Sequence, residues 1–188
     1  YMKEINMENK RNLGKVTALY PTPVTVVGVM AGAKPNWLLM SHVGHVSHSE
    51  MVISCSKAHY SHKFIRDSKR LSINIVDEGM LLEADYVGRV SAAEADKSEV
   101  FEYELGAAGT PVIKAAPVTM ECSVIDIYET AFFDNFILRI ENTYAQERVL
   151  DKAGKLDYTI LKPVVFEMPT YQYLATGKVL GKCRHIVK

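Results

Sequence analysis

The sequence comprises 188 residues, of which 48% are hydrophobic and 23% are charged. This balance is typical of a globular domain and excludes a disordered chain. The 22 Lys and Arg residues equal the 22 Asp and Glu residues in number, so no net positive field favours binding to nucleic acid or to an anionic membrane.

The length is that of one domain, and we expect residues 1–188 to form a single fold with an N-terminal extension over residues 1–12. That extension mixes both charges and has no apolar segment behind a basic start, so it does not resemble a secretory signal. The longest apolar run, Thr22–Ala33, is shorter than the ~20 residues that span a bilayer. Three widely separated cysteines form no Cys-x-x-Cys pair, which favours a reducing cytoplasm.

Strand-forming residues dominate the first part of the chain. Pro23–Met30 is rich in valine, and the turn residues after it lead into a second apolar stretch, which predicts a hairpin. Met51–Ser56 and the alternating Leu71–Asp77 predict two further strands. Between them, Ser61 is placed to cap the start of a short helix.

The composition changes in the middle of the chain. Met80–Gly106 predicts two short helices, the first ending at Gly88. Residues 118–130 and 132–150 then predict two long strands joined by a turn, and a last short strand is expected at Val164–Phe166. Six or seven strands with one helical insert predict a mainly β fold, a small antiparallel barrel.

Five of the six histidines lie within one short window, which suggests a metal site as one hypothesis. They are His42, His45, His48, His59 and His62. The valines and glycine around His42 and His45 favour an extended chain, in which these two side chains face opposite ways. No Glu completes an HExxH motif, so we expect no metal site, although a ligand role for His42, His45 and His59 stays open.

The sequence offers little support for nucleophilic catalysis. Cys55 and Cys122 lie in apolar strands without an adjacent cation that would lower the thiol pKa, so packed core thiols are expected. No P-loop, G-x-G-x-x-G or G-x-S-x-G motif is present. The serine hydrolase, ATPase and Rossmann assignments therefore lose their sequence support.

A phosphate-binding arrangement is a stronger candidate. Ser54–Phe64 joins hydroxyl residues at a strand end to Lys57 and to a helix start near Ser61. Helix-start N–H groups, hydroxyls and one ammonium can together hold a phosphate. The alternative is that Ser61 only caps the helix and Lys57 is solvated. Further on, Lys97 follows Asp96, and an exposed ion pair between the two is expected.

Four segments, in this order and spacing, resemble the flavin reductase-like family of FMN-binding split barrels, and within it the flavoredoxin-type members. They are Tyr20–Val29, Asn36–Ile75, Asp85–Lys97 and Ala116–Val124. The resemblance implies a six-stranded antiparallel Greek-key barrel, a homodimer, and FMN bound near the dimer interface.

The resemblance also implies a set of cofactor-binding residues. A strand carrying Asn36, Met40, Ser41 and His42 would pass along the isoalloxazine ring. The ribityl phosphate would be held by Ser54, Ser56, Lys57, His59 and Ser61, and Lys97 would reach the flavin or its phosphate from the insert. The chain departs from the family at Leu39, often a Thr, and at His42, often an aromatic residue. Backbone contacts do not depend on residue type and are expected at both positions.

The resemblance implies that the flavin carries the chemistry, so no catalytic side chain is expected. NADH or NADPH would supply a hydride, and the reduced flavin would pass electrons to a redox partner protein or leave to serve another enzyme. Two alternatives stay open: a non-catalytic flavin- or haem-binding protein on the same barrel, and a histidine-rich metal-binding protein.

Overall fold

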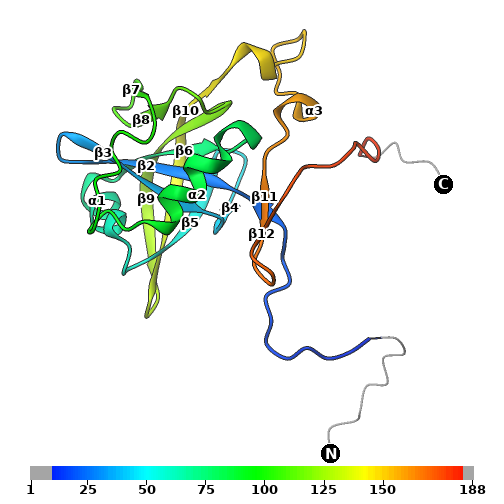
Figure 1. The fold of residues 1–188 in the computed structure, drawn as a ribbon, viewed down its shortest axis with the longest axis horizontal. Helices are drawn as coiled ribbons and strands as arrows, with labels where there is room; N and C mark the ends of the chain where they lie inside the picture. The colour runs from blue at the N-terminus through cyan, green and yellow to red at the C-terminus, as the bar shows by residue number, and fades with distance from the viewer. Residues whose placement is uncertain (1–9, 184–188) are drawn as a thin grey trace, which may run out of the picture.

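The computed structural model describes residues 10–183 and is mainly β (Figure 1). Most of the predicted N-terminal extension lies outside the described residues. The main sheet has seven antiparallel strands in the spatial order β3-β2-β6-β9-β10-β5-β4. They are β2 (Thr25–Ala31), β3 (Lys34–Met40), β4 (Val43–His45), β5 (Glu50–Ser56), β6 (Arg70–Ile75), β9 (Val118–Glu129) and β10 (Phe133–Ala145).

Smaller elements complete the fold. A three-stranded sheet contains β1 (Thr22–Pro23), β11 (Val165–Glu167) and β12 (Gln172–Leu174), and a hairpin contains β7 (Tyr103–Leu105) and β8 (Pro111–Ile113). The helices are α1 (Tyr60–Ser68), α2 (Leu81–Arg89), α3 (Tyr158–Leu161) and the 3-10 turns η1 (Glu78–Met80) and η2 (Glu147–Val149). Within residues 10–183, no helix is long and apolar enough to cross a membrane.

The two edge strands of the main sheet belong to one continuous segment. β3 pairs with β2 along its length, the chain bends at Ser41 and His42, and β4 then pairs with β5. The N–H of Ser54 donates a 3.0 Å hydrogen bond to the carbonyl oxygen of His42, so the bend itself is bonded to β5. With β3 and β4 counted as one bent strand, the sheet curls into the six-stranded barrel that was expected.

The strand order also agrees with the predicted Greek key. The bent strand lies between β2 and β5, its neighbours along the chain. After β5 the chain passes through α1, and β6 then pairs with the free side of β2. Three consecutive strands followed by a fourth that returns beside the first define this topology.

Both faces of β2 and β3 are buried, but in two different cores. Val27 and Leu38 belong to the cluster inside the barrel. Val26 and Trp37 belong to a second cluster with residues of α2, and the Trp37 ring meets the Phe101 ring edge to face at 5.6 Å. Strands buried on both faces appear in the sequence as apolar runs without clean alternation, as these two do.

Helix α1 packs against the barrel core, because its Ile65 is fully buried in the cluster inside the barrel. The prediction that Ser61 caps this helix is wrong. The cap residue is His59, which makes no side-chain cap bond, and Ser61 lies inside the first turn. The Ser61 hydroxyl is bonded to β3 instead, so a tertiary contact has replaced the local one.

The helical insert is shorter than predicted. α2 ends at Arg89 rather than at Gly88, and turns followed by β7 replace the second predicted helix. A Cβ atom added to Gly88 would lie 2.7 Å from Cδ2 of Leu39. The glycine therefore permits close approach of α2 to β3 and does not mark the helix end.

A buried carboxylate fixes the turn between β7 and β8. Glu121 on β9 is fully buried and accepts hydrogen bonds from the backbone of Ala108 and Thr110 and from the side chains of Thr110, Asn142 and Tyr144. Burial by itself would raise the pKa of the Glu121 carboxyl, but these hydrogen bonds outweigh it and leave the pKa below its ordinary value.

We predict that Glu121→Gln lowers the free energy of unfolding at pH 7 by about 2–4 kcal/mol, since the amide keeps the volume but loses several charge-assisted bonds. A lowered pKa stabilises the fold above the unfolded value of about 4.3, and this contribution is lost as the pH falls through the folded value. Urea unfolding should therefore show a difference between the two proteins that shrinks in acid. Equal stability at pH 7 would contradict the assignment.

Candidate functional site

The structure gathers several of the predicted binding residues around a polar cavity of about 150 Å³. We call it the polar pocket. Its walls come from β3, from residues 58–61 at the start of α1, and from the end of α2 with the turn that follows. Its polar lining includes Asn36, His59, Ser61, Ser91 and Lys97. Three elements far apart in the sequence thus contribute donors to one small space.

A buried hydrogen bond joins two walls of the polar pocket. The Nδ2 of Asn36 on β3 donates to the Ser61 Oγ over 2.6 Å. Both side chains are almost completely buried, with exposed fractions of 4% and 2%. The bond fixes the first turn of α1 against the barrel, and this turn carries no acidic residue. Its free N–H groups and the helix dipole favour an anion at this end.

Lys97 places a cation in the same wall. Its side chain is buried, and its Nζ donates to the carbonyl oxygens of Val87 and Val90 at 2.9 Å each. The predicted ion pair with Asp96 is wrong, because Asp96 pairs with Lys34 at 2.6 Å. Burial lowers the pKa of Lys97 to about 8. The lysine therefore satisfies the last carbonyls of α2, where a cation also complements the helix dipole.

His59 completes the polar pocket. Partial burial of its imidazole lowers the pKa of His59, and the nearby charges of Lys97 and His62 lower it further. A lowered pKa favours the neutral imidazole, which can donate one hydrogen bond and accept another.

Lys57 lies on the opposite flank of α1, among charged side chains. Its Nζ is 3.3 Å from Oδ1 of the fully buried Asp134 and 3.8 Å from Glu129. It does not line the polar pocket, although the next residue in the chain, Ala58, does. The predicted phosphate contact of Lys57 thus has no support in the position of this side chain.

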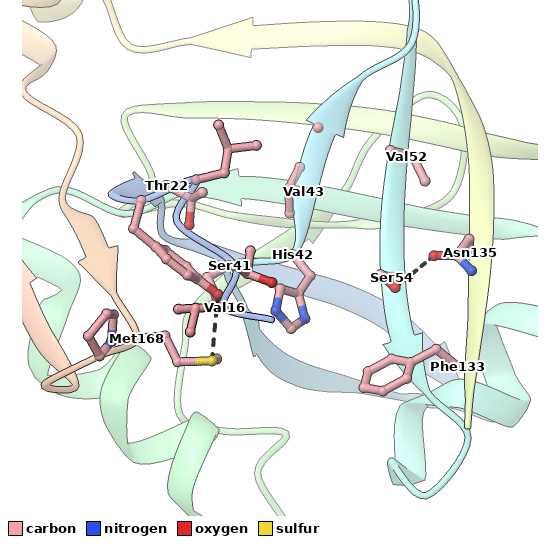
Figure 2. Close-up of a pocket in the computed structure, with 15 residues that line it drawn as sticks. Val16, Thr22, Ser41, His42, Val43, Val52, Ser54, Phe133, Asn135 and Met168 are labelled. Atoms are coloured by element: carbon pink, nitrogen blue, oxygen red, sulfur yellow. Dashed lines mark hydrogen bonds between the residues drawn. The ribbon is translucent and has the colours of Figure 1, made fainter. Parts of the chain in front are cut away.

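A second, larger cavity of about 700 Å³ lies beside the bend between β3 and β4 (Figure 2). We call it the apolar pocket. Ser41, His42 and Ser54 line it together with Val43 and Val52. Figure 2 shows Val16 and Thr22 of the N-terminal segment and Met168 on one side, with Phe133 and Asn135 of β10 on the other. A wide, mainly apolar cavity with a few hydroxyl and amide groups in its lining suits a flat ring that is apolar at one end and polar at the other.

The ten residues predicted to bind a cofactor therefore divide into groups. Four of them, Asn36, His59, Ser61 and Lys97, line the polar pocket, and three others, Ser41, His42 and Ser54, line the apolar pocket. Met40 is buried in the barrel core. The Ser56 hydroxyl accepts a 3.3 Å hydrogen bond from the N–H of Ala58 and so shapes the loop before α1.

Sequence reasoning missed the residues that β10 and the N-terminal segment bring to the apolar pocket. Asn135 accepts a 2.7 Å hydrogen bond from the Ser54 hydroxyl, and the Phe133 ring meets the His42 ring edge to face at 6.2 Å. Tyr20 reaches the same cavity and donates to the sulfur of Met168. These contacts depend on strand register and on the chain ends, for which the sequence contains no local signal.

The histidine window does not form a metal site in the part of the chain that the structure describes. Among residues 10–183, no three His, Cys, Asp or Glu side chains gather in a way that could hold a metal ion. His42 and His62 instead contact the rings of Phe133 and Phe136.

The chain belongs to the flavin reductase like domain family, which matches residues 17–173. The solved structure of flavoredoxin from Methanosarcina acetivorans is similar, with 29% sequence identity and a TM-score of 0.89 over 94% of this chain and 96% of that one. Flavoredoxin of Desulfovibrio vulgaris (Miyazaki F) has 27% identity and a TM-score of 0.86, over 94% and 98% of the two chains. A search of curated proteins finds no match.

The fold is also that of a more distant protein, the FMN-binding protein from Thermus thermophilus with bound 1-cyclohex-2-enone. The two sequences share 20% identity, and the TM-score is 0.78 over 94% of this chain and 100% of the Thermus protein. The family resemblance in the sequence is thus confirmed, including its flavoredoxin type. Family membership places the chain among flavin-binding, oxidoreductase-like proteins.

The cysteines give a direct test of the geometry in solution. Burial raises the pKa of both Cys55 and Cys122 to about 12, with added effects of nearby carboxylates, whereas Cys183 is exposed. We predict that a thiol reagent at pH 8 labels Cys183 quickly in the native protein and all three cysteines only after denaturation. Rapid native labelling of Cys55 or Cys122, located by peptide mapping, would contradict the packed-thiol assignment.

Proposed function

We propose that this protein binds FMN and acts as an NAD(P)H-dependent flavin reductase or as a flavoredoxin-like electron carrier. The observation that carries the proposal is the pairing of two pockets along one bent strand. Asn36 on β3 faces the polar pocket, and Ser41 and His42 at the bend line the apolar pocket. FMN has a matching division, since its phosphate is a compact anion and its isoalloxazine is a flat ring.

The polar pocket fits the phosphate end of the cofactor. Ser61 and His59 offer hydrogen-bonding side chains beside the N–H groups of the α1 start, and Lys97 supplies a positive charge. Two of the three Lys97 donors are used by α2, so one N–H remains for a ligand. A helix start and one cation are sufficient for phosphate binding without a glycine-rich loop.

The apolar pocket fits the ring end. Bound FMN would supply the chemistry by accepting a hydride at its N5 and holding the electrons. The chain would hold the ring against Ser41 and the backbone of the bend and limit the access of water through the valines of β4 and β5. Backbone N–H groups near the polar edge of the ring would stabilise negative charge that develops on reduction.

Two copies of the chain would complete the molecule in this proposal. Both ends of the described chain run away from the barrel (Figure 1). They carry exposed apolar side chains, among them Leu13, Leu19, Val179 and Leu180. Such segments gain stability when a second barrel covers them, which supports a homodimer. A redox partner protein would then take electrons from the reduced flavin, and a reducing cytoplasm would keep the thiols free.

The first test is the visible spectrum of the purified protein after addition of excess FMN and desalting. A retained flavin band together with NADH- or NADPH-dependent bleaching supports the carrier function. NAD(P)H oxidation that requires added FMN, without a retained band, supports the reductase function. A retained band with no nicotinamide oxidation above background would leave a non-catalytic flavin binder. The absence of both signals would disprove the proposal.

We also predict that Ser41→Trp abolishes binding of both FMN and riboflavin, because the indole would fill the space for the ring that the two ligands share. Titration of flavin fluorescence measures both affinities. The matched control is Ser47→Trp, which places the same side chain in the exposed turn after β4, away from both pockets. Retained flavin binding by Ser41→Trp, or an equal loss in the control, would show that the ring does not lie against the bend.

A further inference from the structure

Two fully buried carboxylates lie on neighbouring strands of the barrel, Glu121 on β9 and Asp134 on β10. Glu121 is saturated by hydrogen bonds around the turn between β7 and β8. The proposed flavin reactions use neither group directly. Burial of a carboxylate costs several kcal/mol unless the carboxylate is paired. The partners of Asp134 therefore show which part of the fold this buried group holds in place.

Among residues 10–183, the ion-pair and hydrogen-bond partners of the Asp134 side chain, Lys57, His62 and Arg66, lie in one short segment that runs from the end of β5 into α1. Its Oδ2 accepts hydrogen bonds from Nη1 of Arg66 at 2.6 Å and is 2.8 Å from Nε2 of His62. Its Oδ1 is 3.3 Å from Nζ of Lys57 and has no other polar partner among residues 10–183. Glu129 strengthens the cluster through a second 2.6 Å bond to Arg66.

These contacts bracket the wall of the polar pocket. The four consecutive residues 58–61 all line that pocket, and they lie between Lys57 and His62, which both contact Asp134. On the opposite side, Asn36 holds Ser61 to β3. The start of α1 is thus fixed from two strands at once, by an ionic contact to β10 and a hydrogen bond to β3.

We propose that Asp134 is a positioning residue for the anion-binding end of the flavin site. It touches no ligand; it holds residues 58–61 so that the N–H groups and side chains of the helix start converge on the phosphate. This inference rests on the proposed binding of FMN. In this role Lys57, His62 and Arg66 together hold the start of α1 to Asp134. Asp134 therefore affects the affinity for the phosphate of a flavin and not the affinity for its ring.

An effect of Asp134 on phosphate binding can be distinguished from an effect on stability, because Glu121, the other buried carboxylate, provides a matched control. Asp134→Asn and Glu121→Gln each convert a fully buried carboxylate into an amide of the same size on adjacent strands. Both variants are expected to lose stability. Only the first changes the contacts that flank the polar pocket, so only the first should change the preference of the protein for FMN over riboflavin.

The experiment compares the dissociation constants of FMN and riboflavin for the unmodified 188-residue chain and for both variants. They are measured by flavin fluorescence at a temperature where circular dichroism shows all three proteins folded. We expect Asp134→Asn to weaken FMN binding about tenfold, the loss of roughly one charge-assisted contact, and riboflavin binding less than twofold. Glu121→Gln should change both constants less than twofold. Equal weakening of both flavins by Asp134→Asn, no weakening, or the same FMN-selective loss in Glu121→Gln would overturn the inference.

A milder variant keeps the test available if Asp134→Asn does not fold. Arg66→Gln removes one of the Asp134 contacts from a partly exposed position of α1 that does not line the polar pocket. We expect an FMN-selective loss in the same direction but smaller. If this variant leaves the ratio of FMN to riboflavin affinity unchanged, the inference fails. If the unmodified protein binds neither flavin, the proposed function fails first, and this inference with it.

Discussion

The barrel depends on one strand that is hydrogen-bonded to both edges of the sheet. Between Lys34 and His45 the chain pairs first with β2 and then, after the bend at Ser41 and His42, with β5. An open antiparallel sheet would leave two unpaired edges, each a row of unsatisfied N–H and C=O groups. The bent strand satisfies both edges with a single segment, and this requires the sheet to curl around the core of Val27, Leu38 and their neighbours.

The same bend determines where ligands can be held. Before it, the strand runs beneath α1 and α2, and Asn36 is drawn into the small polar pocket. After it, β4 crosses to β5 and leaves room beside β10, which becomes the apolar pocket. The bend moves the pairing of this segment from β2 to β5, so residues before and after it border different parts of the barrel. The bend that closes the barrel therefore also lies between the two pockets.

Much of the fold was accessible from the sequence because strand propensity and turn residues are local. The β-branched Pro23–Met30 and the alternating Leu71–Asp77 identify their strands without knowledge of the rest of the chain.

The predictions that were wrong concern residues whose contacts come from distant parts of the chain. The local sequence makes Ser61 look like a helix cap, but its hydroxyl is hydrogen-bonded to Asn36 of β3. The local sequence also makes Lys97 look like a partner of Asp96, but its Nζ is bonded to two carbonyl oxygens at the end of α2. The partners of Asp134 could not be foreseen either, since they follow from the register of β10 on β5.

The electrostatics of the site also differ from those of the whole chain. Equal numbers of acidic and basic residues give the protein no net field, so a phosphate is not steered from a distance. Near the start of α1 the balance is different, because the first turn carries no acidic residue and the ammonium of Lys97 lies in the adjoining wall. The buried Asp134 contacts the segment that carries these groups through Lys57, His62 and Arg66, and the cations of Lys57 and Arg66 offset the negative charges of Asp134 and Glu129. Asp134 itself does not line the polar pocket, so its carboxylate does not face a ligand held there. The result is a local preference for anions that acts over short distances in a protein of zero net charge.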